Sequence, residues 1–267
     1  MNDKQIPQKI VDWMDSLNWG RHHDKWHFER RFDYWSVLAN THPDPSVRAD
    51  VKKMLDYANQ QGWERAPLQE GEPGSGIDFL SMHRAMLILL LGHFPELQHY
   101  FRGWETPPTD PSDKDDPVPD QSNFDSAKVS AIDVIRNSPS RFISDDDFGR
   151  YLETSIRPLP GNPTNRDPNP ELGIHNYLHN RWSIEGSPVN LGDPKVNILN
   201  ARFWRLHGWI DYQWWRFRLE KQADDNEESY QSLIRNYIQM MEHSIHTFGI
   251  QQQEDNRPKA FSRTFEL

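Results

Sequence analysis

The feature that most constrains this chain is a histidine arrangement that occurs twice. In the first copy, His23 and His27 are four residues apart, and His83 follows on a later apolar stretch. Four residues is close to one helical turn, so both imidazoles of such a pair lie on one helix face. A polar ring inside an apolar helix needs a partner. The arrangement therefore predicts helices that turn their histidine faces toward one another.

The second copy consists of His175, His179 and His207. Together the two copies predict four helices that direct six imidazoles into one interior. Neutral imidazole is a good ligand for copper, zinc, iron and nickel, and a catalytic ion keeps open positions beside its protein ligands. We interpret the six histidines as the ligands of two metal ions about 3.5–4 Å apart, the spacing of two-metal sites. Six neutral ligands add no negative charge, which suits copper.

Other assignments of the histidines stay open. His22 could replace His23, and His42 could replace either member of the first pair. We interpret the remaining four histidines as surface residues, namely His93, His99, His243 and His246. A histidine pair at helical spacing also fits hydrogen-bonded core residues. A binding or scaffold module whose histidines never meet is therefore the competing interpretation.

Composition limits the chemistry further. The chain has 267 residues, no cysteine and a formal net charge of −10. Without cysteine, disulfides, thiolate zinc sites, iron–sulfur clusters and cysteine nucleophiles are excluded, so any metal must be held by His, Asp or Glu. The acidic balance argues against a nucleic-acid partner. A carboxylate-bridged di-iron bundle needs paired Glu-x-x-His motifs, and we find only the one that ends at His99.

The ends and the apolar runs predict a location. The polar start MNDKQIPQKIVDWMDSL has no apolar stretch of the kind that signal peptides carry. The longest apolar run, AMLILLLG from Ala85, is too short to span a bilayer. We therefore expect a cytoplasmic protein with no membrane partner.

Helical periodicity and few strand signals predict a mainly α protein. We expect a central antiparallel four-helix bundle that holds a dinuclear metal site, with long Pro-rich loops, in a single domain over residues 1–267. Asp78 is a predicted N-cap and Ser144 a predicted helix start. The other expected segments are helical patterns within 5–40, helices at 46–61 and 227–248, two short helices within 124–157, and loops at 103–123 and 158–172.

Two motifs in the second half carry a family resemblance. The run FWRLHGWID from Phe203 to Asp211 has Phe, an aromatic residue, two free positions, His, three free positions and Asp. Upstream, the run HNYLH from His175 to His179 has the form His-Asn-x-x-His. These motifs resemble the second copper site of the tyrosinase and hemocyanin family, the type-3 copper proteins.

The first half resembles the same family less closely. The run FLSMHRAML from Phe79 to Leu87 is similar to the family's FLxWHRxxL, with Met82 in place of Trp. Tyrosinases usually carry another histidine shortly before that Phe, and this chain does not. A His-x-x-x-His pair far upstream is similar to the arrangement in arthropod hemocyanins, and His23 with His27 supplies it.

The resemblance implies two copper ions that bind dioxygen as a bridging peroxide. The implied function is an oxidoreductase that hydroxylates or oxidises a phenolic, aminophenolic or catecholic small molecule, with O2 and that molecule as its partners. It also implies that Asn176 orients a water that deprotonates the phenol; the other reading of Asn176 is a helix-surface amide. Asp211 would anchor an imidazole or an arginine, or else form a surface ion pair with Arg202 or Arg205. Two alternatives remain, a dizinc enzyme for elimination or hydrolysis and an O2-binding protein without turnover.

Overall fold

The computed structural model describes residues 5–109, 124–154, 158–159, 162–166 and 169–242. In these ranges the chain folds into eleven α-helices, three short 3-10 helices and one small two-stranded sheet. The prediction of a mainly α protein is confirmed.

The helices, in chain order, are α1 Gln8–Ser16, α2 Trp19–Glu29, α3 Phe32–Thr41, α4 Pro45–Gln60, α5 Ser75–His93, α6 Gln98–Phe101, α7 Ser126–Asn137, α8 Asp145–Glu153, α9 Ile174–Asn180, α10 Ala201–Glu220 and α11 Glu228–Glu242. The 3-10 helices are η1 Pro95–Leu97, η2 Pro139–Arg141 and η3 Asn197–Leu199. The strands are β1 Pro158–Leu159 and β2 Asn162–Arg166.

Local side-chain caps fix the starts of several helices. The Asp44 carboxylate accepts the Ser46 N–H before α4, and the Ser144 hydroxyl accepts the Asp147 N–H before α8. Such caps satisfy backbone donors that the first helical turn leaves free. The predicted helix start at Ser144 is therefore confirmed.

The predicted N-cap at Asp78 is wrong. Helix α5 begins at Ser75, and the preceding Gly74 has a φ of +97°, a conformation that glycine adopts without strain. Asp78 lies inside the first turn, where Tyr237 donates a hydrogen bond to its carboxylate and Arg30 pairs with it. These tertiary partners take the carboxylate that would otherwise cap the helix.

Helix α5 is the central helix of the core. It has 19 residues and, by length and composition alone, is apolar enough to cross a membrane. However, 67% of its apolar 18-residue stretch is buried inside the molecule. The apolar run from Ala85 lies within this helix, which begins at Ser75, three residues before the predicted cap at Asp78. A helix that is apolar all round is expected in the middle of a core.

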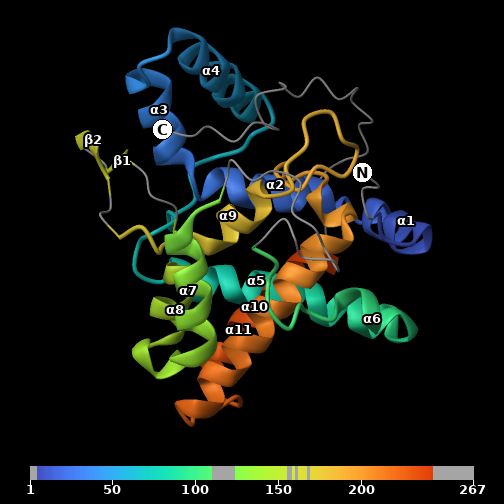
Figure 1. Cartoon of the computed structure of the whole chain (residues 1–267). Helices are drawn as coiled ribbons and strands as arrows, with labels where there is room; N and C mark the ends of the chain where they lie inside the picture. The colour runs from blue at the N-terminus through green and yellow to red at the C-terminus, as the bar shows by residue number, and fades with distance from the viewer. Residues whose placement is uncertain (1–4, 110–123, 155–157, 160–161, 167–168, 243–267) are drawn as a thin grey trace.

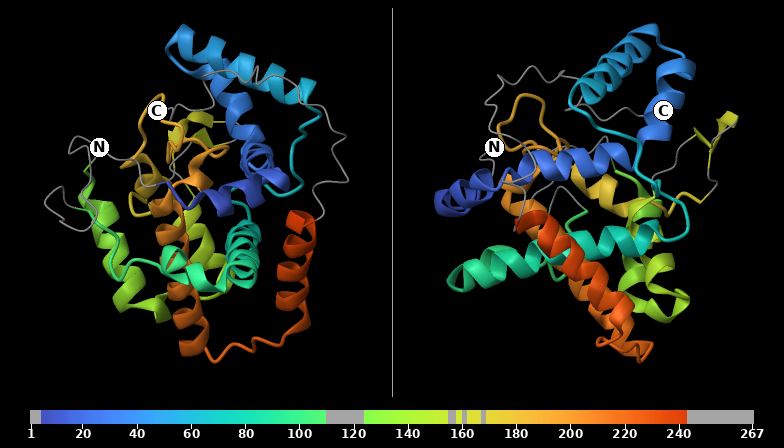
Figure 2. Two further views of the ribbon diagram at one scale, coloured as in Figure 1. Left: turned by 90° about the vertical axis from the view of Figure 1, so that its right-hand side faces the viewer. Right: turned by 180° about the vertical axis from the view of Figure 1, so that it is seen from behind.

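The main hydrophobic core draws on most of the chain, from Ile6 to Met241. Helix α11 packs on α5, and α10 crosses α5 on another side. Two smaller clusters lie with α3 and α4, which project together from the rest of the molecule in Figures 1 and 2. The four helices that carry the predicted ligands, α2, α5, α9 and α10, lie around the middle of the molecule (Figure 1).

The predicted loop at 158–172 contains a short hairpin, so this part of the prediction is wrong. Strand β1 pairs antiparallel with β2, with Leu159 opposite Asn162. A prolyl residue in each strand hid the signal, because proline is tolerated in strands only at edges, ends and bulges. In the predicted loop at 103–123, residues 103–109 form no helix or strand, and residues 110–123 lie outside the described residues. The predicted last helix is described as far as Glu242.

Glycines set the distance between α5 and α8. A Cβ at Gly76 would lie 2.1 Å from Asp146 O and 2.3 Å from Arg150 N, and a Cβ at Gly149 would lie 2.1 Å from Gly76 O. The two backbones therefore touch where the helices cross. This contact holds the start of α5, the helix that carries His83, against α8.

We predict that Gly76→Ala destabilises the fold by about 1–3 kcal/mol or more, because the helices must separate to admit the methyl group. The matched control is Gly92→Ala on the same helix, where a Cβ meets nothing within 4 Å. That change should be neutral or stabilising by roughly 0.5–1 kcal/mol through helix propensity. Urea unfolding of both variants measures the difference, and equal midpoints would contradict the proposed close packing.

Candidate metal centre

Six buried histidines from four helices meet in the interior. Helix α2 supplies His23 and His27, α5 supplies His83, α9 supplies His175 and His179, and α10 supplies His207. Each is at most 6% exposed. The structure thus brings together all six residues that the sequence analysis proposed as ligands, and the interpretation in which the histidines never meet is wrong.

Nitrogen–nitrogen distances divide the cluster into two groups. In one group, the nitrogen atoms of His23, His27 and His83 lie within 4.8 Å of one another, and in the other those of His83, His175 and His207 do so. His83 therefore belongs to both groups. The ring of His179 lies beside the second group, with its centroid 4.5 Å from that of His175 and 5.6 Å from that of His207.

Backbone carbonyls fix the tautomer of four rings. The Nδ1–H of His83 donates to Phe79 O at 2.9 Å, and that of His207 donates to Phe203 O at 2.7 Å, each one turn back on its own helix. A carbonyl only accepts, so Nδ1 carries the proton and the neutral ring presents its Nε2 lone pair. Two further Nδ1 contacts, each 2.7 Å long, join His23 to Pro194 O and His179 to Leu191 O.

The Nε2 atoms are arranged as a metal would require. Nε2 of His23 lies 3.1 Å from Nε2 of His27, and Nε2 of His175 lies 3.1 Å from Nε2 of His207. Two imidazole nitrogens that share one ion at about 2.0–2.1 Å, at angles between a right angle and the tetrahedral angle, lie roughly 2.8–3.4 Å apart. Nε2 of His83 is buried without a hydrogen-bond partner, as is Nε2 of His179. Buried nitrogens of this kind are expected where an ion belongs.

Burial keeps the imidazoles neutral. It is the largest cause that lowers the pKa of His23 to about 3 and the pKa of His179 to about 4. Burial, followed by the charges of neighbouring imidazoles, also lowers the pKa of the other four rings well below the usual value. Metal binding requires the deprotonated imidazole, so the cluster is in its ligand form at neutral pH.

Aromatic rings surround the histidines. The Phe203 ring centroid lies 3.9 Å from that of His207 and 5.3 Å from that of His23. Phe79 packs between His83 and His175, at 4.7 and 4.8 Å. These rings exclude water from the centre and restrict the imidazole rotamers.

Asn176 lies at the edge of the centre, directly after His175. Its Oδ1 accepts a hydrogen bond from Nη2 of Arg31 at 2.9 Å, and its Nδ2 donates to Glu153 O at 3.4 Å. The side chain is therefore held by tertiary contacts and is partly buried, which differs from a free helix-surface amide.

Asp211 pairs with an arginine that the sequence analysis did not consider. Nε of Arg84, next to His83, donates to Asp211 Oδ1 at 2.5 Å. This ion pair ties α5 to α10 beside the centre, as an arginine anchor would. The predicted surface pairs of Asp211 with Arg202 or Arg205 are not what the structure shows.

The remaining histidines lie outside the two ligand groups. His22 is buried on α2 but belongs to neither group. Nδ1 of His42 accepts the Asp44 N–H at 3.1 Å in the turn before α4. His93 and His99 are exposed, as predicted, whereas residues 243 and 246 lie outside the described residues.

Charged residues next to the centre were missed by the sequence analysis. Arg30 is 3% exposed and pairs with both carboxylate oxygens of the fully buried Glu153. Arg31 donates from Nε to Glu70 at 2.6 Å. The partners are 123 and 39 residues apart in sequence. No local spacing links residues so distant, so the sequence carried no signal for these pairs.

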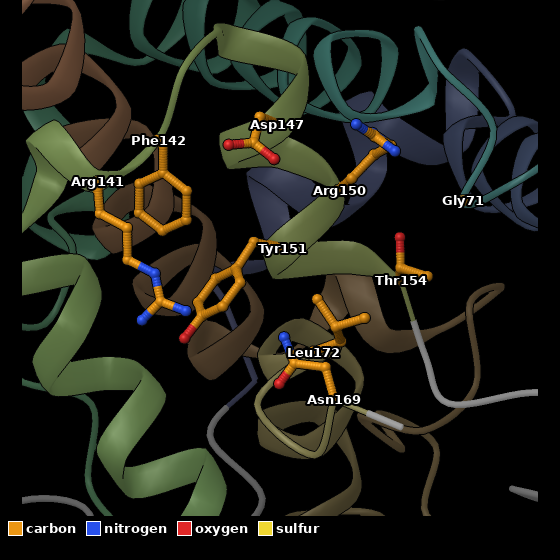
Figure 3. Close-up of a pocket in the computed structure, with 9 residues that line it drawn as sticks. All are labelled: Gly71, Arg141, Phe142, Asp147, Arg150, Tyr151, Thr154, Asn169 and Leu172. Carbon is orange, nitrogen blue, oxygen red and sulfur yellow. The ribbon is translucent and has the colours of Figure 1, made fainter. Parts of the chain in front are cut away.

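A separate cavity of about 250 Å³ lies beside α8, without any of the six histidines in its lining. Figure 3 shows Arg141, Phe142 and Tyr151 along one side of it, with Thr154 and Arg150 on the other. Both Arg141 and Tyr151 contact Glu171, and Arg150 pairs with Asp146. The cavity is polar and distinct from the metal centre.

No model of a known protein family matches the chain, and no curated protein matches it either.

We predict that His83→Ala removes bound metal from both groups, because His83 contributes to each. Protein that binds about two ions per chain should retain fewer than one, and elemental analysis after loading and desalting measures this. His99→Ala, at an exposed position of helix α6, is the matched control and should bind as much metal as the unchanged protein. Full metal content in a folded His83→Ala variant would contradict the assignment.

Proposed function

We propose that this protein is a dinuclear copper oxidoreductase that uses O2 to hydroxylate or oxidise a phenolic, aminophenolic or catecholic small molecule. The observation that carries the proposal is the buried cluster of six neutral imidazoles on four helices. The resemblance of the runs around His83, His175 and His207 to the type-3 copper motifs supports the same function.

The ligand set supports copper. Both ligand groups found in the described residues consist of histidine alone, without a carboxylate. Imidazole suits copper, and copper binds such sites more tightly than other divalent ions of its row. Two copper ions, when bound, supply the one-electron redox chemistry that O2 reduction and phenol oxidation require. The residues His23, His27, His83, His175, His179 and His207 would hold them.

The protein positions the ligand nitrogen atoms and excludes water from the centre. Backbone acceptors fix the four rings whose Nδ1 contacts were described above, so their Nε2 atoms need little reorganisation to bind an ion. Asn176 offers an amide at the edge of the centre, where a phenol substituent would approach. Its hydrogen bond to Arg31 holds that amide in one orientation.

A dizinc centre is the second candidate, because the same observation favours it. Zinc takes neutral imidazole at the same distances as those fitted above. Such a centre would polarise a bound group and activate water for elimination or hydrolysis, without redox chemistry. An O2-binding protein without turnover would bind O2 at the same copper centre and oxidise no substrate.

We predict that copper-reconstituted protein consumes O2 when catechol is added, and that zinc-reconstituted protein does not. The protein is purified without added metal, analysed for its elements, loaded with either ion and placed in an oxygen electrode. O2 uptake with copper supports the oxidoreductase. Reversible O2 binding without catechol turnover would instead identify a carrier, and zinc in the purified protein with no copper-dependent uptake would identify the dizinc alternative.

A second prediction concerns Asn176. If its amide orients the water that takes the phenol proton, Asn176→Ala should slow phenol hydroxylation by about 100-fold. Catechol oxidation by the same preparation is the internal control and should change much less. An equal loss on both substrates would contradict a role in phenol deprotonation.

A further inference from the structure

A guanidinium group lies at the edge of the histidine cluster. Arg31 stands between α2 and α3, four residues after His27. Its Nη2 contacts Asn176, which directly follows His175. Arg31 therefore connects the end of α2 with the beginning of α9, the two helices that carry the histidine pairs.

Burial distinguishes Arg31 from its neighbour. The Arg31 side chain is 15% exposed, whereas the Arg30 side chain is 3% exposed. Arg30 is also engaged by protein groups, since it binds both oxygens of Glu153, donates to Ser75 O and pairs with Asp78. Of the two adjacent guanidinium groups, Arg31 is the one that keeps access to solvent beside the buried imidazoles.

The two acceptors of Arg31 differ in strength. Nε donates to the carboxylate of Glu70, whose side chain is 1% exposed, and this bond fixes one edge of the guanidinium group. Nη2 donates to the neutral amide oxygen of Asn176. A carboxylate adds an opposite charge and a second acceptor oxygen to this contact, whereas the amide offers one neutral oxygen. An incoming carboxylate can therefore replace the amide at Nη2 while Glu70 keeps Nε.

The charge of the centre favours the same kind of ligand. Neither histidine group contains a carboxylate, so an ion bound there would keep its full positive charge. A buried site of low dielectric strengthens attraction to an anion. A planar aromatic acid can place its ring toward the histidines and its carboxylate toward the guanidinium fork, which matches a carboxylate in geometry.

We infer that Arg31 anchors the carboxylate of an aromatic acid substrate, so that the centre acts on phenols that carry a carboxylate group. The inference rests on the proposed function, which supplies the aromatic ring and its oxidation. The carboxylate takes the place of Asn176 Oδ1 at Nη2, while Nδ2 of Asn176 keeps its contact with Glu153 O. Arg31 is thus a specificity-determining residue for this site.

The test compares two probes of nearly equal shape, benzoate and benzamide, by titration calorimetry on zinc-loaded protein, which cannot turn them over by redox chemistry. We expect benzoate to bind at least about tenfold more tightly than benzamide, the difference that one charge-assisted pair supplies. In Arg31→Gln that ratio should fall to near one, and Arg31→Lys should recover part of it. The matched control is Arg65→Gln, which removes an arginine whose side chain is 42% exposed and pairs with Asp33 nearby.

Copper-loaded protein supplies the kinetic form of the same test. The KM for 3,4-dihydroxybenzoate should rise about tenfold or more in Arg31→Gln, a clearly larger rise than that of the KM for catechol in the same variant, and Arg31→Lys, which keeps the charge beside Glu70, should reverse part of it. A benzoate-to-benzamide ratio near one in the unchanged protein overturns the inference without any variant. A ratio that survives Arg31→Gln also overturns it, because the carboxylate then binds elsewhere, for example to the ion. Failure of copper-loaded protein to oxidise either phenol contradicts the proposed function instead, and the binding ratio still decides the role of Arg31.

Discussion

The structure depends on how a buried imidazole satisfies both of its nitrogen atoms. Each ring in the cluster is cut off from water, so a nitrogen without a partner lowers stability. The Nδ1–H groups of His83 and His207 solve this within their own helices, at Phe79 O and Phe203 O. Of their Nε2 atoms, that of His83 has no hydrogen-bond partner and that of His207 lies 3.1 Å from Nε2 of His175. An ion would satisfy several of these nitrogen atoms at once.

The segment between α9 and η3 takes part in the same arrangement. Leu191 O accepts from His179 and Pro194 O accepts from His23, so one loop fixes a ring from each of the two histidine pairs. The Asn190 side chain holds that loop by accepting the backbone N–H groups of Ile184 and Gly192. A segment without regular structure thus positions ligands of both halves of the centre.

Buried ion pairs form a second layer outside the imidazoles. Arg30 with Glu153 and Arg31 with Glu70 join the end of α2 to α8 and to the 63–74 segment. Removing one member of a buried pair leaves an uncompensated charge, which destabilises a protein by about 3–5 kcal/mol. The pairs therefore fix the register of α2, and with it the positions of its two histidines. Burial raises the pKa of Glu153 to about 7, although Arg30 favours its charged form.

Spacing along the sequence was sufficient to predict the helical class and the six histidines, because a period of four residues determines which side chains share a helix face. It was not sufficient for Asp78, whose carboxylate is taken by Arg30 and Tyr237 instead of the helix start. The partners of Arg84 and Arg31 and the Pro194 carbonyl that accepts from His23 were also beyond prediction. These contacts arise where segments far apart in sequence meet. The strands around Asn162 were hidden for another reason, because each contains a proline.

The most direct measurement of the central claim is anomalous diffraction at the copper edge from crystals of the loaded protein. The account predicts two peaks per chain about 3.5–4 Å apart, enclosed by Nε2 atoms from α2, α5, α9 and α10. A single peak, two peaks separated by much more than this distance, or ions bound at surface carboxylates would contradict it.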